Sequence, residues 1–84
     1  MNTTQTKTAP ADYLEPGYWS KSEHRKIDDI SEALSTLPDS LLSVIQTAFL
    51  TFEAGMPFEV EQERPDLVRD ARKMVVATQV ARCL

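Results

Sequence analysis

Cysteine and histidine are almost absent from this sequence, with one of each, Cys83 and His24, among 84 residues. A single cysteine excludes an internal disulfide, and structural zinc sites draw several ligands from these two residue types. No apolar run approaches the ~20 residues that a membrane-spanning helix needs. We therefore expect no metal, no cofactor and no membrane partner. So short a chain builds only a small core, and we expect self-association, most simply a homodimer, or a partner protein to add stability.

The sequence also lacks a large excess of either charge, since 9 basic and 13 acidic residues leave a net charge of −4. This balance argues against nucleic acid as a partner, because nucleic-acid binding needs a basic surface. Met1–Ala11 is polar and lacks the apolar stretch of a signal peptide, so we expect a cytoplasmic protein. The hydrophobic fraction of 42% is that of an ordinary globular chain, and the length predicts one domain.

The chain divides into a tail and a single domain. Residues 1–12 hold no large apolar side chain after Met1, which predicts a disordered N-terminal tail. Residues 13–84 predict an all-α fold, a small three-helix domain that self-associates. The helices are expected near 21–37, 39–54 and 65–84.

The first helix has clear boundary signals. Ser20 and Glu23 have the spacing of a capping box, in which each side chain accepts a hydrogen bond from the other residue's backbone N–H. Apolar residues then follow at helical spacing, at Ile27, Ile30, Leu34 and Leu37. Pro38 disfavours helical geometry at the residue before it, so this helix should end at Leu37.

The second helix is the expected centre of the core. Asp39 or Ser40 can cap its start, and from there to Glu53 the segment is uncharged. So wide an apolar surface predicts a helix that is buried on more than one side. Gly55 and Pro57 then end it. The residues expected to be largely buried in the domain are Ile30, Leu34, Leu37, Leu41, Val44, Ile45, Ala48, Phe49, Phe52, Leu67, Ala71, Met74 and Val75.

The rest of the chain consists of a short connection and a last helix. Phe58–Arg64 alternates its glutamates with other residues, which predicts an extended linker that becomes a strand only beside a second copy or a partner. Pro65 and Asp66 open the last helix. Residues 74–84 carry a single charge, and we expect this apolar end to mediate self-association. The residues assigned to that contact are Val76, Val80, Cys83 and Leu84.

An aromatic segment, Tyr13–Trp19, precedes the first helix. Pro16 and Gly17 suit the central positions of a type II turn over Glu15–Tyr18, because glycine allows the positive φ of the second of them. Two interpretations stay open. The segment is either a flap over the groove between helices or an anchor for a partner protein, since Trp and Tyr dominate interface hot spots. The anchor residues are then Tyr13, Leu14, Tyr18 and Trp19.

Basic residues gather once, at His24, Arg25 and Lys26, and offer a weak anion-binding site. Consecutive residues point to different sides of a helix, however, and Arg25 has Asp28 and Asp29 within one turn, which favours a solvated face. No nucleophile elbow, glycine-rich loop or HExxH motif accompanies His24. We therefore expect no enzyme and no catalytic residue.

Leu41–Glu53, followed by Gly55-Met56-Pro57-Phe58-Glu59-Val60, resembles the second helix and the following segment of ribbon-helix-helix antitoxins. The resemblance covers this stretch only. It implies a dimeric DNA-binding repressor whose tail wraps a toxin and whose N-terminal strand enters the DNA major groove. The strand would fall at His24–Ile27, where the capping box predicts a helix.

The preferred prediction is a non-enzymatic protein-binding module, a small inhibitor, regulator or adaptor that acts by occupying the surface of a partner protein. Its size suits the small regulators of host proteins that mobile elements encode. The alternative is the antitoxin-like repressor. A third candidate is an oligomer that binds a small anionic metabolite, for which the support is the basic group His24–Lys26 beside the aromatic segment.

Overall fold

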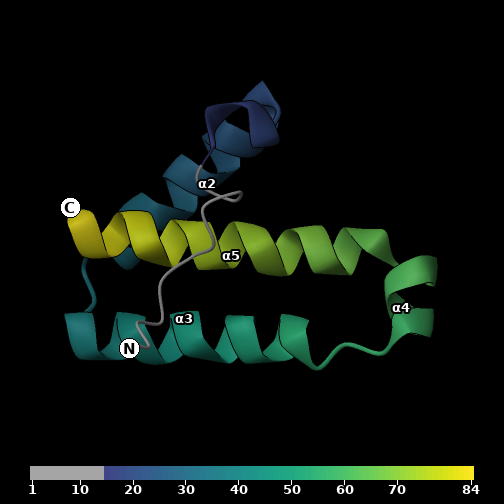
Figure 1. The fold of residues 1–84 in the computed structure, drawn as a ribbon. Coiled ribbons are helices and arrows are strands. Elements are labelled where there is room, and N and C mark those ends of the chain that lie inside the picture. The colour runs from purple at the N-terminus through teal and green to yellow at the C-terminus, as the bar shows by residue number, and fades with distance from the viewer. Residues whose placement is uncertain (1–14) are drawn as a thin grey trace, which may run out of the picture.

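The computed structural model describes residues 15–84, which are all-α and contain no strand (Figure 1). The elements are the 3₁₀ helix η1 (Pro16–Tyr18) and the α-helices α2 (Lys21–Leu34), α3 (Asp39–Ala54), α4 (Phe58–Glu63) and α5 (Pro65–Cys83). The all-α prediction is confirmed for this part of the chain. The predicted tail lies outside the described residues, and so do Tyr13 and Leu14.

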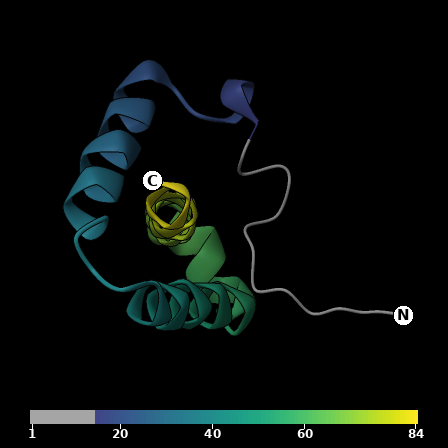
Figure 2. The same cartoon turned by 90° about the vertical axis from the view of Figure 1, so that its left-hand side faces the viewer.

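Helix α5 is the centre of the fold. Helices α2 and α3 both pack against α5 and have little contact with each other, and the view along α5 shows one on each of two sides (Figure 2). The prediction that the helix at 39–54 forms the centre is wrong. Only Leu42 and Gln46 of α3 are buried, because this helix packs with one side only.

The core therefore differs from the expected one. Its buried apolar residues are Trp19, Ile27, Leu42, Val68, Ala71, Val75, Val76, Ala77 and Ala81. Of the expected set, Ala71 and Val75 are buried, while Ile30, Leu34, Leu37, Ile45, Phe49, Leu67 and Met74 are half-buried. The prediction is wrong for Leu41, Val44, Ala48 and Phe52, which are exposed on α3. An almost uncharged helix does not reveal in its sequence which side will face the core.

The start of α2 is the predicted capping box. The Ser20 hydroxyl accepts a hydrogen bond from the Glu23 N–H at 3.2 Å, and Glu23 Oε1 accepts one from the Ser20 N–H at 3.0 Å. The helix ends at Leu34, one turn earlier than predicted. The Ser35 hydroxyl donates to the Glu32 carbonyl at 2.7 Å and so binds an acceptor of the last turn, as serine commonly does where a helix ends.

Two helix starts differ from the expectation. Pro38 occupies the N-cap position of α3 and no side chain caps this end, so the predicted cap by Asp39 or Ser40 is wrong. Phe58–Glu63 forms helix α4 instead of an extended linker. Over six residues an alternating pattern also fits a short helix, and acidic residues in the first turn favour the helix N-terminus.

The turn before α2 is a 3₁₀ turn rather than a type II turn. The Tyr18 N–H donates to the Glu15 carbonyl at 3.0 Å, as either turn requires. Gly17, however, lies outside the left-handed region that the type II turn needs. The backbone thus continues in a helical sense through Pro16–Tyr18 and turns at Trp19 into the start of α2.

Candidate functional site

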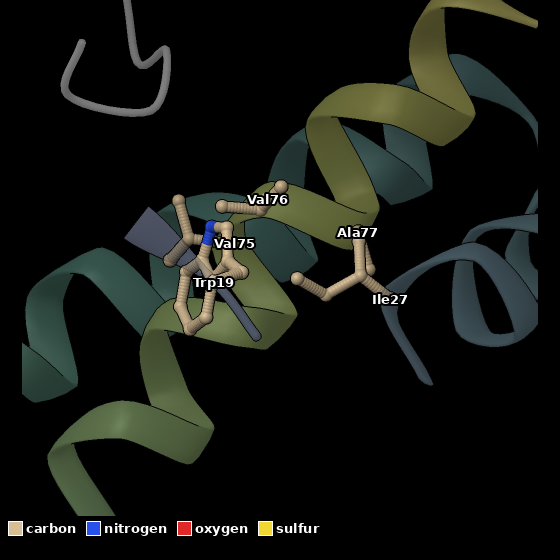
Figure 3. Packing of buried hydrophobic residues seen from close by; sticks show 5 residues of the cluster. All are labelled: Trp19, Ile27, Val75, Val76 and Ala77. Atoms are coloured by element: carbon tan, nitrogen blue, oxygen red, sulfur yellow. The ribbon is translucent and has the colours of Figure 1, made fainter. Parts of the chain in front are cut away.

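Trp19, one of the proposed anchor residues, is packed inside the chain. Only 5% of it is exposed, and it lies in a cluster with Ile27 of α2 and with Val75 and Val76 of α5 (Figure 3). This is the position that the internal-flap interpretation expects. A role of the aromatic segment in binding a partner stays a prediction.

Arg69 of α5 contacts Tyr18 and Trp19, which lie at the described end of the aromatic segment. Its guanidinium lies 5.0 Å from the centre of the Tyr18 ring and 4.7 Å from that of Trp19. The two rings meet edge to face at 4.8 Å. Arg69 Nη2 also donates a hydrogen bond to the Tyr18 carbonyl at 2.7 Å. Cation–π attraction and a charge-assisted hydrogen bond therefore act on the same short segment.

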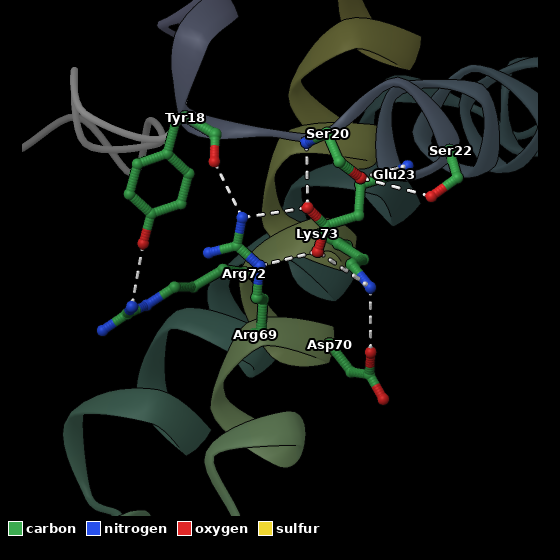
Figure 4. Close-up of polar contacts among 8 residues, drawn as sticks. All are labelled: Tyr18, Ser20, Ser22, Glu23, Arg69, Asp70, Arg72 and Lys73. Carbon is green, nitrogen blue, oxygen red and sulfur yellow. Dashed lines mark hydrogen bonds and ion pairs between the residues drawn. The ribbon is translucent and has the colours of Figure 1, made fainter.

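The same arginine binds Glu23 at the start of α2 (Figure 4). Arg69 Nε lies 2.6 Å from Glu23 Oε2 and Nη2 lies 2.9 Å from Oε1, while Lys73 Nζ approaches Oε2 at 3.4 Å. The hydrogen bonds from Arg69, helped by the one from the Ser20 N–H, hold the pKa of Glu23 well below its usual range. Glu23 in turn raises the pKa of Arg69.

Arg72, one helical turn further along α5, extends this network to α3. Its Nη1 donates to the Tyr18 hydroxyl at 2.9 Å, and its Nε donates to Glu53 Oε2 at 2.8 Å. Arg69 and Arg72 thus connect η1, the start of α2 and the end of α3 to the central helix. Sequence reasoning missed this role, because the partners of each arginine are distant in the chain and no local spacing marks them.

A second polar cluster joins α3 to α5. Gln46 is fully buried, and its Nε2 donates to Gln79 Oε1 at 2.9 Å. Its Oε1 accepts a hydrogen bond from Arg82 Nη1 at 3.0 Å, and Arg82 Nε donates to Asp39 Oδ1 at 2.9 Å. Since a buried amide must be satisfied, this cluster favours one register of α3 along α5.

The weak anion-binding residues do not form a converging site. His24 is half-buried, whereas Arg25 and Lys26 are exposed, and all three are consecutive on α2. At 3.6 residues per turn, consecutive side chains point about 100° apart. The geometry is that of a helix surface rather than a cradle for one anion.

The residues assigned to self-association have different surroundings. Val76 is buried beside Trp19 and Val80 is half-buried, whereas Cys83 and Leu84 are exposed. The argument that the C-terminal half of the last helix lacks cover is wrong, because α2 and α3 flank α5 and cover Val76 within one chain. Contact between copies through Cys83 and Leu84 stays a prediction.

Three of the five exposed large hydrophobic residues in 15–84 lie on helix α3. We call Leu41, Val44, Ala48 and Phe52 the α3 outer face. Leu41 is 43% exposed, Val44 63% and Phe52 50%, and only Phe58 and Leu84 join them as exposed large hydrophobic residues in 15–84. No charged residue lies between Asp39 and Glu53. Sequence reasoning noted this uncharged stretch but assigned it to the core.

Nowhere in 15–84 do three or more histidine, cysteine, aspartate or glutamate side chains gather closely enough to hold a metal ion. None of the helices in this part of the chain combines the length and the apolar character that crossing a membrane requires.

The comparisons with known proteins return nothing: no protein-family model matches the chain, and neither a curated protein nor a solved structure is significantly similar to it. The ribbon-helix-helix alternative also lacks its defining strand within the described residues. His24–Ile27, where that strand would fall, belongs to helix α2.

Proposed function

We propose that this protein is a non-enzymatic protein-binding module, a small inhibitor, regulator or adaptor that acts by occupying the surface of another protein. The α3 outer face is the observation that carries the proposal. It replaces the aromatic segment as the proposed docking surface, because Trp19 is already packed in the core of the chain.

A solvent-facing helix normally alternates an apolar stripe with charged residues on the opposite side. Helix α3 lacks those charges, since Asp39 and Glu53 stand at its two ends with none between them. Its exposed side therefore offers apolar and hydroxyl-bearing side chains to water. A contiguous exposed apolar patch of this kind marks protein-interaction surfaces.

The two acidic residues at the ends of α3 are already paired within the chain. Asp39 binds Arg82 at 2.9 Å, and Glu53 binds Arg72 at 2.8 Å. A partner can therefore cover the α3 outer face without stripping water from an unpaired charge, which is the costly part of burying charged groups. The complex should accordingly persist at high salt, because it depends on apolar contact rather than on ion pairs.

Affinity capture with a substituted α3 tests the proposal. Tagged wild-type protein and the Val44→Glu variant are compared by quantitative mass spectrometry of the captured proteins at high salt. Phe58→Glu is the matched control, because it places the same charge on another exposed hydrophobic residue, 69% exposed on α4. We expect wild type and Phe58→Glu to capture the same partner and Val44→Glu to lose it. Equal capture by all three proteins would refute the proposal.

A further inference from the structure

We infer that the α3 outer face docks the α3 outer face of a second copy, with the two helices antiparallel about a two-fold axis. The inference rests on the proposed function, in which this face is a protein-docking surface. It names the occupant of the face in the free protein, a second copy that a partner protein displaces when it binds. It differs from self-association through the end of α5, which was the expectation from sequence.

The absence of charge selects the occupant. A charged helix laid on the α3 outer face would leave its charges buried without partners, and the face offers none in return. Within the described residues, the exposed positions of α2, α4 and α5 include acidic or basic side chains. The exposed side of α3 does not, apart from its two ends. The surface of this chain that matches an α3 outer face is therefore another α3 outer face.

The ends of the helix also allow such a pair. In an antiparallel arrangement Asp39 of each copy comes near the end of α3 that carries Glu53 of the other copy. Both carboxylates keep their arginine partners, Arg82 and Arg72, on the far side of α3 within their own chain. Like charges therefore meet as neutral ion pairs, and the opposed helix dipoles favour the antiparallel sense.

The spacing of the side chains is complementary to itself. With the two-fold axis at residue 46, Val44 lies level with Ala48 of the second copy, and Leu41 lies within one residue, about 1.5 Å along the axis, of the level of Phe52. Small Ala48 makes room for Val44 at the centre, and the larger side chains close the two ends. Leu42 and Gln46 are the residues of α3 that are buried, and the α3 outer face is exposed beside α5, so α5 does not cover it.

The mass of the full chain in solution is the first test. Light scattering and sedimentation at micromolar concentrations should give about twice 9.5 kDa for the wild type. Val44→Glu should raise the dimer dissociation constant at least about a hundredfold, because two-fold symmetry buries the new carboxylate twice. Val44 is 63% exposed in the single chain, so the helical circular dichroism signal of this variant should be unchanged.

Matched controls locate the interface. Phe58→Glu and Leu84→Glu introduce the same charge at side chains that are 69% and 77% exposed, outside α3. Both variants should remain dimers. If Leu84→Glu dissociates the dimer and Val44→Glu does not, the interface lies at the end of α5 and the inference is wrong.

Disulfide cross-linking tests the antiparallel sense. In a Cys83→Ser background, which removes the exposed native cysteine, the Leu41→Cys variant is mixed with the Phe52→Cys variant. An antiparallel pair should cross-link the mixture under mild oxidation and leave each variant alone largely uncoupled, since bridged Cα atoms must lie within about 7 Å. Cross-linking of each variant with itself would indicate a parallel pair and overturn the geometry.

A monomeric wild type at every accessible concentration would overturn the inference as a whole. The proposed function fails on a different result, namely when Val44→Glu captures the same proteins as the wild type. A monomer that loses a captured partner on Val44→Glu would therefore refute the dimer and leave the docking surface in place.

Discussion

Arg69 and Glu23 lie 46 positions apart in the sequence and share two hydrogen bonds, at 2.6 and 2.9 Å. Glu23 is also the residue whose carboxylate completes the capping box of α2. The Glu23 side chain thus caps the start of α2 and also attaches α2 to α5. Removing its charge should weaken the attachment of α2, while an amide in its place can still cap the helix.

The pH dependence of stability should report this pair. The folded-state pKa of Glu23 lies below its unfolded value, so the ion pair contributes fully above the ordinary glutamate pKa of about 4.3. That contribution is lost as the pH falls from there toward the lowered folded-state pKa. We expect the melting temperature of the wild type to drop below about pH 5, and the drop to be smaller in Glu23→Gln.

Glu59→Gln is the control for that measurement, because it removes one negative charge from an exposed position of α4. Its melting temperature should follow the wild-type curve. Identical acid sensitivity of wild type and Glu23→Gln would show that the Glu23–Arg69 ion pair does not contribute to the stability of the fold.

Trp19→Ala should lower the free energy of unfolding by about 3–5 kcal/mol, the range for a buried aromatic residue. The reason is that Trp19 packs against Ile27, Val75 and Val76 and also lies under the Arg69 guanidinium. Urea or thermal unfolding followed by circular dichroism measures the change. An unchanged melting temperature together with loss of a partner would instead support the anchor interpretation.

Leu42→Ala and Leu41→Ala form a matched pair that tests how α3 is rotated about its axis. Leu42 is 2% exposed and faces α5, so its truncation should cost about 2–5 kcal/mol. Leu41 is 43% exposed, and its truncation should change the stability of the monomer by no more than about 0.5 kcal/mol. Unfolding is measured at protein concentrations low enough to keep the chain monomeric. Comparable losses for both variants would contradict the observed orientation of α3.

Gln46 and Gln79 should be energetically coupled. Gln46→Leu leaves the half-buried Gln79 amide, and also Arg82, without its Gln46 partner in the α3–α5 contact, and an unsatisfied group costs up to about 1–3 kcal/mol when it is fully buried. Adding Gln79→Leu removes that group, so the double variant should be more stable than the sum of the single effects predicts. A double-mutant cycle from urea unfolding measures the coupling, which we expect at about 0.5 kcal/mol or more. Strict additivity would show that the two amides act independently.

Local signals predicted the starts of α2, α3 and α5 and the end of α3, because those signals act between residues that are close in the chain, but they placed the end of α2 one turn too late. The predicted capping box at Ser20 and Glu23 and the predicted helix start at Pro65 are both present in the structure. Helix α4 was missed, since six residues are too few for a helical period to be told from an alternating one.

The same local signals could not show which side of each helix is covered. Helix α3 is almost uncharged around its whole circumference, and its sequence therefore fits a buried helix as well as one with an exposed apolar side. Only the packing of α3 against α5 decides that Leu42 is buried and Leu41 is not.

The sequence by itself determined a small, all-α chain with its main helix boundaries, because capping groups, prolines and apolar periodicity act over a few residues. The tertiary structure alone decided that α5 is central, that Trp19 is internal and that Arg69 reaches Glu23. Those outcomes depend on contacts between residues far apart in the chain, whose energies depend on how whole helices are placed against one another.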